Sequence, residues 1–215
     1  MRNYKKERCS DLHGSYNNIL DLKVTRTNQS SGAKWYKEAN EIAYSLGKLA
    51  GFNTSTRRVQ VGAGILAALS PQTEWGDNIH MAHMVVGGGT ATGQTTVNNE
   101  KAFKILSGEH PLEVLGGLKV VPFYKAIVSP LGDNTPVIDR HSAAVYMGRP
   151  LSERELGFLA SPVINRRIAG AYIRAALHQG VHPNTLQAQS WLQWRQNKGI
   201  TRRVGGQQKE VYTKR

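Results

Sequence analysis

The sequence predicts an all-α fold. Apolar residues recur at helical spacing along most of the chain, as they do from Ala33 to Gly51. Residues typical of helix ends divide these segments: Ser152 and Glu155 have the spacing of a capping box, and Gly180 follows a long helical segment. No convincing run of alternating apolar and polar residues predicts a strand. We therefore expect a protein built from helices alone.

The helical segments follow one another through the middle of the chain, and roughly nine or ten helices are expected. They cover residues 33–51, 59–69, 76–86, 96–106, 111–115, 120–128, 137–147, 152–160, 161–179 and 184–196. We assign residues 33–200 to one helical domain. Residues 1–32 are polar and are expected to form a flexible N-terminal arm, and residues 201–215 are expected to form a basic C-terminal tail.

Composition excludes several classes of protein. Hydrophobic residues make up 40% of the 215 residues, which argues against wholesale disorder. No apolar run approaches the roughly 18–20 residues that a membrane span requires, and the N-terminus lacks the apolar stretch of a secretory signal. The single cysteine, Cys9, excludes a disulfide framework. We expect a cytoplasmic monomer that does not bind membranes.

The positive charge is concentrated in the C-terminal part of the chain. The net charge is +13, and the segment from Leu156 to Arg215 contains ten Lys and Arg residues against one acid, Glu210. Such a distribution suits a polyanion, because each neutralised phosphate releases condensed counterions. Arg166 and Arg167 are therefore candidate DNA contacts. The alternative is a basic protein whose charge serves solubility alone.

The histidines and glycines do not predict a metal or cofactor site. His80 and His83 lie one helical turn apart, but no carboxylates accompany them. His178 and His182 flank a helix end. The run of three glycines at 87–89 follows no strand and precedes no Lys-Ser or Lys-Thr pair, so it does not predict a phosphate-binding loop. We expect no metal and no cofactor.

Three short segments carry residues that merit a functional interpretation. They are Leu69–Thr73, which contains Gln72, Leu115–Lys119, which contains two glycines, and Val137–His141, which contains Asp139. Each also has an ordinary structural explanation. Gln72 fits a solvated turn, a Gly-Gly pair is common between helices, and Asp139 fits an N-cap that accepts hydrogen bonds from the first turn of a helix.

In this order, the three segments resemble motifs of the helix-hairpin-helix DNA glycosylase superfamily, and of endonuclease III-like proteins in particular. The resemblance implies a two-lobed helical fold with a DNA-binding cleft. It implies that Asp139 is the catalytic carboxylate and that Gln72 fills the space that a flipped-out base leaves in the duplex. It also implies that the backbone N–H groups of Gly116 and Gly117 face a DNA phosphate, with Lys119 adding charge there.

The sequence departs from these motifs at informative positions. Gly116 replaces the family's proline, and Lys119 replaces the second glycine of the hairpin. Bifunctional members carry a lysine where this chain has Val121, which cannot form a Schiff base. The resemblance therefore implies a monofunctional enzyme. With Cys9 as the only cysteine, the iron–sulfur cluster of many endonuclease III-like proteins is excluded.

Other residues near these segments are candidates for DNA or base contacts. Trp75, His141 and Trp191 are candidates for the pocket that receives the base, and Trp191 also fits core packing. Lys125 and Arg140 are candidate DNA contacts, and Arg140 also fits an ordinary salt bridge beside the catalytic position.

The function that we expect is that of an enzyme that binds double-stranded DNA and acts on a flipped-out base. A monofunctional glycosylase, which cleaves the N-glycosidic bond, is the leading interpretation. One alternative is a transferase of the same fold that modifies a DNA base. The sequence also looks like small phage-encoded proteins with the same Ala-Leu-Ser-Pro-Gln and Ile-Asp-Arg-His segments, which would place the protein in the host cytoplasm. Another alternative is a DNA-binding module without catalysis.

Overall fold

The computed structural model describes residues 12–199, and over these residues the prediction of an all-α fold is confirmed. The described part of the chain forms eleven helices and no strand. They are α1 (Tyr16–Leu20), α2 (Arg26–Leu49), α3 (Ser55–Ala68), α4 (Trp75–Val86), α5 (Thr96–Leu106), α6 (Pro111–Val114), α7 (Val120–Val128), α8 (Arg140–Met147), α9 (Glu153–Phe158), α10 (Pro162–Gln179) and α11 (Pro183–Asn197).

The prediction of a flexible N-terminal arm is wrong for residues 12–32. Leu12 and Ile19 are each 1% exposed and belong to a hydrophobic core. Thr25 accepts a hydrogen bond from the backbone N–H of Asn28 and thereby caps α2, which begins at residue 26 rather than 33. Two buried apolar side chains and a cap are enough to order a segment that looks polar by composition. The start of the arm (residues 1–11) and the predicted basic tail lie outside the described residues.

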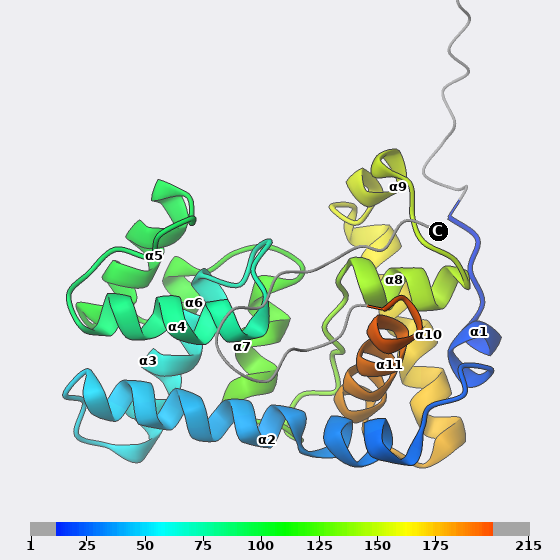
Figure 1. Ribbon diagram of the computed structural model, residues 1–215, viewed down its shortest axis with the longest axis horizontal. Helices are drawn as coiled ribbons and strands as arrows, with labels where there is room; N and C mark the ends of the chain where they lie inside the picture. The colour runs from blue at the N-terminus through cyan, green and yellow to red at the C-terminus, as the bar shows by residue number, and fades with distance from the viewer. Residues whose placement is uncertain (1–11, 200–215) are drawn as a thin grey trace, which may run out of the picture.

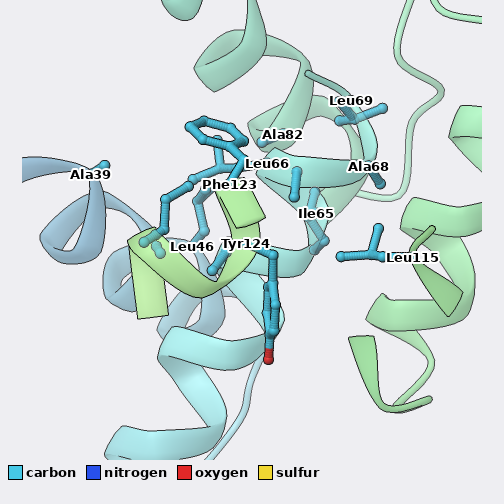
Figure 2. Packing of buried hydrophobic residues seen from close by; sticks show 14 of the residues in the cluster. Ala39, Leu46, Ile65, Leu66, Ala68, Leu69, Ala82, Leu115, Phe123 and Tyr124 are labelled. Carbon is cyan, nitrogen blue, oxygen red and sulfur yellow. The ribbon is translucent and has the colours of Figure 1, made fainter. Parts of the chain in front are cut away.

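The helices pack around two hydrophobic cores. The first core takes residues from α2, α3, α4, α5 and α7, and the second takes residues from α1, α8, α10 and α11. In Figure 1, α3 to α7 lie on one side, α1 and α8 to α11 lie on the other, and α2 runs beneath both groups. Figure 2 shows part of the first core, where Leu46, Leu66 and Phe123 gather from three different helices.

Two glycines allow α2 and α3 to pack with their backbones in contact. A Cβ atom on Gly62 of α3 would collide with the carbonyl oxygen of Ala43 on α2. A Cβ atom on Gly47 of α2 would likewise collide with the carbonyl oxygen of Arg58 on α3. The two helices therefore cross where both lack a side chain, and α3 is buried almost continuously from residue 61 to residue 68.

The ends of the later helices follow the sequence closely. Ser152 and Glu155 form the predicted capping box of α9, and Gly180 adopts the left-handed conformation just after α10. The helix expected from residue 137 begins only at Arg140, because Asp139 has an extended backbone and serves as its N-cap. No helix within residues 12–199 is long and apolar enough to span a membrane.

The glycine contact between α2 and α3 makes a prediction about stability. Gly62→Ala should destabilise the protein by about 1–3 kcal/mol, the usual range for overpacking a core, because the helices must separate. Gly170→Ala in α10 is the matched control, since a Cβ atom there meets nothing within 4 Å. It should stabilise the protein by up to about 1 kcal/mol through helix propensity. Thermal and urea unfolding measure both, and equal effects would contradict the packing described here.

Candidate active site

A pocket of about 620 Å³ brings together residues from segments far apart in the sequence. Its walls come from α2, the 70–78 segment, the 117–123 segment, the 137–141 segment and α11, with a few residues from the start of α10 and the turn before it. It therefore touches helices that contribute to both hydrophobic cores. This size lies within the range of about 300–1,000 Å³ that is typical of ligand-binding pockets.

Aromatic rings form much of the pocket wall. The ring centroid of Trp35 lies 5.0 Å from that of Trp75, 6.0 Å from that of Phe123 and 6.2 Å from that of Trp191. The rings of Trp75 and Phe123 are 6.2 Å apart and nearly perpendicular. Rings at such distances and angles support one another, and aromatic side chains that line a pocket suit a flat, aromatic ligand.

Asp139 lies in this wall and accepts hydrogen bonds on both carboxylate oxygens. Its Oδ1 accepts from the backbone N–H groups of His141 (3.0 Å) and Ser142 (2.8 Å), and the Ser142 hydroxyl lies 3.0 Å away. Its Oδ2 accepts from the indole Nε1–H of Trp191 at 3.1 Å. The carboxylate thus caps α8 and is also fixed from α11.

The surroundings of Asp139 favour its ionised form. Burial raises the pKa of Asp139, but the positive charges of His141 and Lys119 and the hydrogen bonds from Ser142 lower it by more, so that it lies below its ordinary value of 3.8. For His141, burial lowers the pKa below 6.5, although the Asp139 charge opposes this. At neutral pH we therefore expect a carboxylate beside a largely neutral imidazole.

A buried hydrogen-bond network connects Asp139 to α2. The Tyr36 hydroxyl donates to Oε1 of Gln187 at 2.8 Å, and Nε2 of Gln187 donates to the Ser142 hydroxyl at 3.2 Å. The Ser142 hydroxyl in turn lies within hydrogen-bond distance of Asp139. Burial, reinforced by the Asp139 charge, raises the pKa of Tyr36 well above its ordinary value, so its hydroxyl remains a donor.

An ion pair supports the pocket on the Trp191 side. Arg195 forms two hydrogen bonds with Glu74, at 2.9 and 2.7 Å, and the two side chains are only 11% and 17% exposed. The Arg195 guanidinium also lies 4.5 Å from the centre of the Trp191 ring. Arg195 therefore links the start of α4 to the tryptophan that donates to Asp139.

The structure brings most of the predicted site residues into one pocket. Those that line it are Gln72, Trp75, Gly117, Lys119, Asp139, Arg140, His141 and Trp191. The remaining candidates do not line it, namely Gly116, Lys125, Arg166 and Arg167. Lys125 lies 3.7 Å from Asp133 in an exposed ion pair, and the two arginines are exposed on α10. Arg140 is exposed, and its Nε lies 3.4 Å from Nε2 of His141.

The turns that carry Gln72 and Gly117 have unusual backbones. Gln72 is exposed and has a φ of 57°, and it is the single non-glycine residue with positive φ in the described range. Gly117 has a φ of 97° in the turn between α6 and α7. This turn is exposed at Gly116 and Gly117, and Lys119 caps α7 without a side-chain hydrogen bond to the helix.

Sequence reasoning missed several members of the site. The sequence analysis gives no site role to Trp35, Phe123, Gln187 or Glu74, and the first two fall within segments expected only to be helical. Each depends on a contact between segments more than 40 residues apart, for which the local sequence carries no signal. Within residues 12–199, no group of three or more His, Cys, Asp or Glu residues is arranged to hold a metal ion.

The fold and the pocket define an all-helical protein with an ionised carboxylate among aromatic side chains. The chain belongs to a family of unknown function, DUF7178, whose model matches residues 1–198. No curated protein and no solved structure matches the chain.

The lowered pKa of Asp139 makes a prediction about stability and pH. Because the folded-state pKa lies below the ordinary value of 3.8, its ionisation stabilises the fold above that pH, and the stabilisation is lost as the pH falls through the folded-state value. Asp139→Asn should therefore flatten the fall in unfolding free energy below about pH 4. Glu155→Gln is the comparison, since Arg149 lowers the pKa of this half-buried carboxylate to about 2 and its removal should flatten the acid fall by a contribution of its own, away from the pocket. Urea unfolding at a series of pH values measures the slopes. An unchanged slope in Asp139→Asn would contradict the assignment.

Proposed function

We propose that the protein is a monofunctional DNA glycosylase that binds a flipped-out base in the aromatic pocket and hydrolyses its N-glycosidic bond with the help of Asp139. The observation that carries this proposal is the ionised Asp139 carboxylate, held by hydrogen bonds at the wall of a pocket lined by tryptophans. The two-lobed glycosylase-like fold and its DNA-binding cleft are part of the same proposal.

The pocket wall supports the binding of a nucleobase. A base that leaves the duplex loses stacking worth a few kcal/mol, and stacking on aromatic side chains recovers part of it. Trp35, Trp75 and Trp191 offer such surfaces around one space. In the proposed complex, the base lies among these rings and the sugar lies near Asp139.

The charge state of Asp139 supports hydrolysis through an oxocarbenium-like sugar. As the bond to the base breaks, the base takes the bonding electrons and positive charge develops on the sugar. A carboxylate that stays ionised stabilises this charge and orients the water that adds to the anomeric carbon. The proton that the water loses passes to the departing base, which leaves as the neutral free base. Its lowered pKa suits this electrostatic role better than the storage of a proton.

The exposed residues near the pocket support a DNA-binding role. Gln72 is exposed and lines the pocket. In the proposed complex its side chain fills the space that the flipped-out base leaves in the duplex. The exposed turn at Gly116 and Gly117 offers backbone N–H groups, and the exposed Arg166 and Arg167 add to a net charge of +13.

A base-modifying transferase is the second candidate. The pocket, at about 620 Å³, has more space than one flat heterocycle fills, which leaves room for a second reactant.

Mass spectrometry of bases and nucleosides after incubation with phage or host DNA separates the candidates. Release of a free base supports the glycosylase, a gain of mass on a base supports the transferase, and DNA binding with neither product supports a non-catalytic module.

The proposed role of Asp139 predicts different effects for two substitutions. Asp139→Asn can still cap α8 through its amide oxygen, but its NH2 group then faces the Trp191 indole N–H, so stability should fall by about 1–3 kcal/mol, the cost of a buried donor without its acceptor. Base release should fall by about two to four orders of magnitude, because the charge that stabilises the sugar is gone. Asp139→Ala should lose both the activity and the cap. Melting temperature, DNA affinity and base release are measured on each variant, and full turnover by Asp139→Asn would show that the carboxylate is not catalytic.

The proposed monofunctional reaction predicts that borohydride traps no covalent adduct with DNA. Val121 occupies the position of the attacking lysine and has no amine. Lys119 is the control, because it lines the pocket and its charge acts on Asp139. An adduct that forms in the wild type and disappears in Lys119→Ala would contradict the monofunctional mechanism. It would show that the amine of Lys119 attacks the sugar in place of a lysine at position 121.

A further inference from the structure

The glycine-rich segment between α4 and α5 has no part in the chemistry proposed above. It contains the three glycines that follow α4, and it ends at Gln94, just before the Thr95 cap of α5. Gly88 and Gly93 have φ values of 86° and 88°, so the segment turns sharply twice before Gln94. These turns return the chain to the segment that carries Gln72.

Gln94 binds two backbone carbonyls just before Gln72 and also contacts the side chain just after it. Its Nε2 donates to the carbonyl oxygen of Leu69 at 3.0 Å and to that of Pro71 at 3.3 Å, and it also contacts the Thr73 hydroxyl. Nδ2 of Asn98 donates to Oε1 of Gln94 at 2.8 Å. This bond fixes which end of the Gln94 amide faces the turn, so the donor end points to the carbonyls.

The turn at Gln72 needs such support. A non-glycine residue in the left-handed region is strained, and this backbone conformation persists only where the surroundings impose it. Within the turn, the Thr73 hydroxyl donates to the Pro71 carbonyl at 3.1 Å, and the Thr73 N–H reaches the Ser70 carbonyl only at 3.4 Å. The bond from Gln94 to the Leu69 carbonyl, at 3.0 Å, is shorter than either of these and joins the turn to the glycine-rich segment.

The first turn of α5 holds the glycine-rich segment in place. Oδ1 of Asn99 accepts from the N–H of Ala91 at 2.9 Å, and Nδ2 of Asn99 lies 3.2 Å from the Ala91 carbonyl. Ala91 and Asn99 are both buried. Together with the bond from Asn98 to Gln94, these contacts make α5 the rigid base from which the segment reaches the Gln72 turn.

We propose that Gln94 is a positioning residue that holds the Gln72 turn in the conformation that contacts DNA. This inference rests on the proposed function, since it assigns to Gln94 the task of presenting Gln72 to the duplex. Gln94 does not line the pocket, and it acts through the backbone of residues 69–73. The glycines after α4 allow the sharp turn that helps to bring Gln94 to that backbone.

The test is the isosteric substitution Gln94→Glu, compared with Gln72→Ala and with the double variant. The change to a carboxylate keeps the size of the side chain and an acceptor for Asn98, but it removes the donor to Leu69 and Pro71. Hydrogen–deuterium exchange of the 69–78 peptide should be faster than in the wild type, without DNA present. Affinity for a fluorescent duplex with one tetrahydrofuran abasic site should fall about tenfold, or about 1.4 kcal/mol. The double variant should lose little more than either single variant, because both changes remove the same contact.

Gln189→Glu is the matched control. Nε2 of this buried glutamine also donates to a backbone carbonyl, that of Gln29 at 3.0 Å, but Gln189 does not line the pocket. It should leave both the exchange of residues 69–78 and the DNA affinity unchanged.

Each departure from these results has a distinct meaning. Unchanged exchange in Gln94→Glu overturns the inference, whatever the DNA affinity does. Faster exchange with undiminished affinity, while Gln72→Ala weakens binding, shows that Gln94 serves local packing only and also overturns it. If Gln72→Ala itself has no effect on affinity, the DNA-facing role of Gln72 in the proposed function fails, and the coupling to Gln94 fails with it. Base release measured separately reports on Asp139 and is independent of these outcomes.

Discussion

The rest of the site depends on how the Asp139 carboxylate is held. One of its oxygens accepts from the first turn of α8, and the other accepts from Trp191 on α11. The carboxylate therefore joins two helices of the second core while it faces a pocket whose opposite wall belongs to the first core. Any movement of α11 relative to α8 changes the position of the one residue on which the proposed chemistry rests.

The electrostatics of the pocket follow from this arrangement. A partly buried carboxylate requires donors or positive charge nearby, since burial alone favours its protonated form. Ser142 and Trp191 supply donors, and Lys119 supplies charge from the turn before α7. The Glu74–Arg195 pair holds the guanidinium over the ring of Trp191, the residue whose indole N–H donates to Asp139.

Local chemistry explains what the sequence could predict. The capping box of α9, the end of α10 and the cap at Asp139 all depend on residues within four positions of one another, and each was recognised. The N-terminal arm was misjudged because Leu12 and Ile19 are ordered by contacts with helices more than 100 residues away. For the same reason, the sequence indicated Asp139 and a base pocket with Trp75 and Trp191 but not the parts of its wall that Trp35 and Gln187 contribute.

The structural explanation of Asp139 as an N-cap accounts for only part of its surroundings. A cap needs acceptors for the first-turn N–H groups of its own helix, and Oδ1 alone provides them. Such caps are usually exposed and need nothing further. Here Oδ2 is engaged by an indole from another helix, Tyr36 and Gln187 extend the network, and aromatic rings cover the adjacent space. These features add desolvation that a helix cap does not require. A carboxylate that stabilises positive charge on a reacting sugar does require them. The contacts of Asp139 that go beyond those of an N-cap are therefore the physical argument for the proposed chemistry.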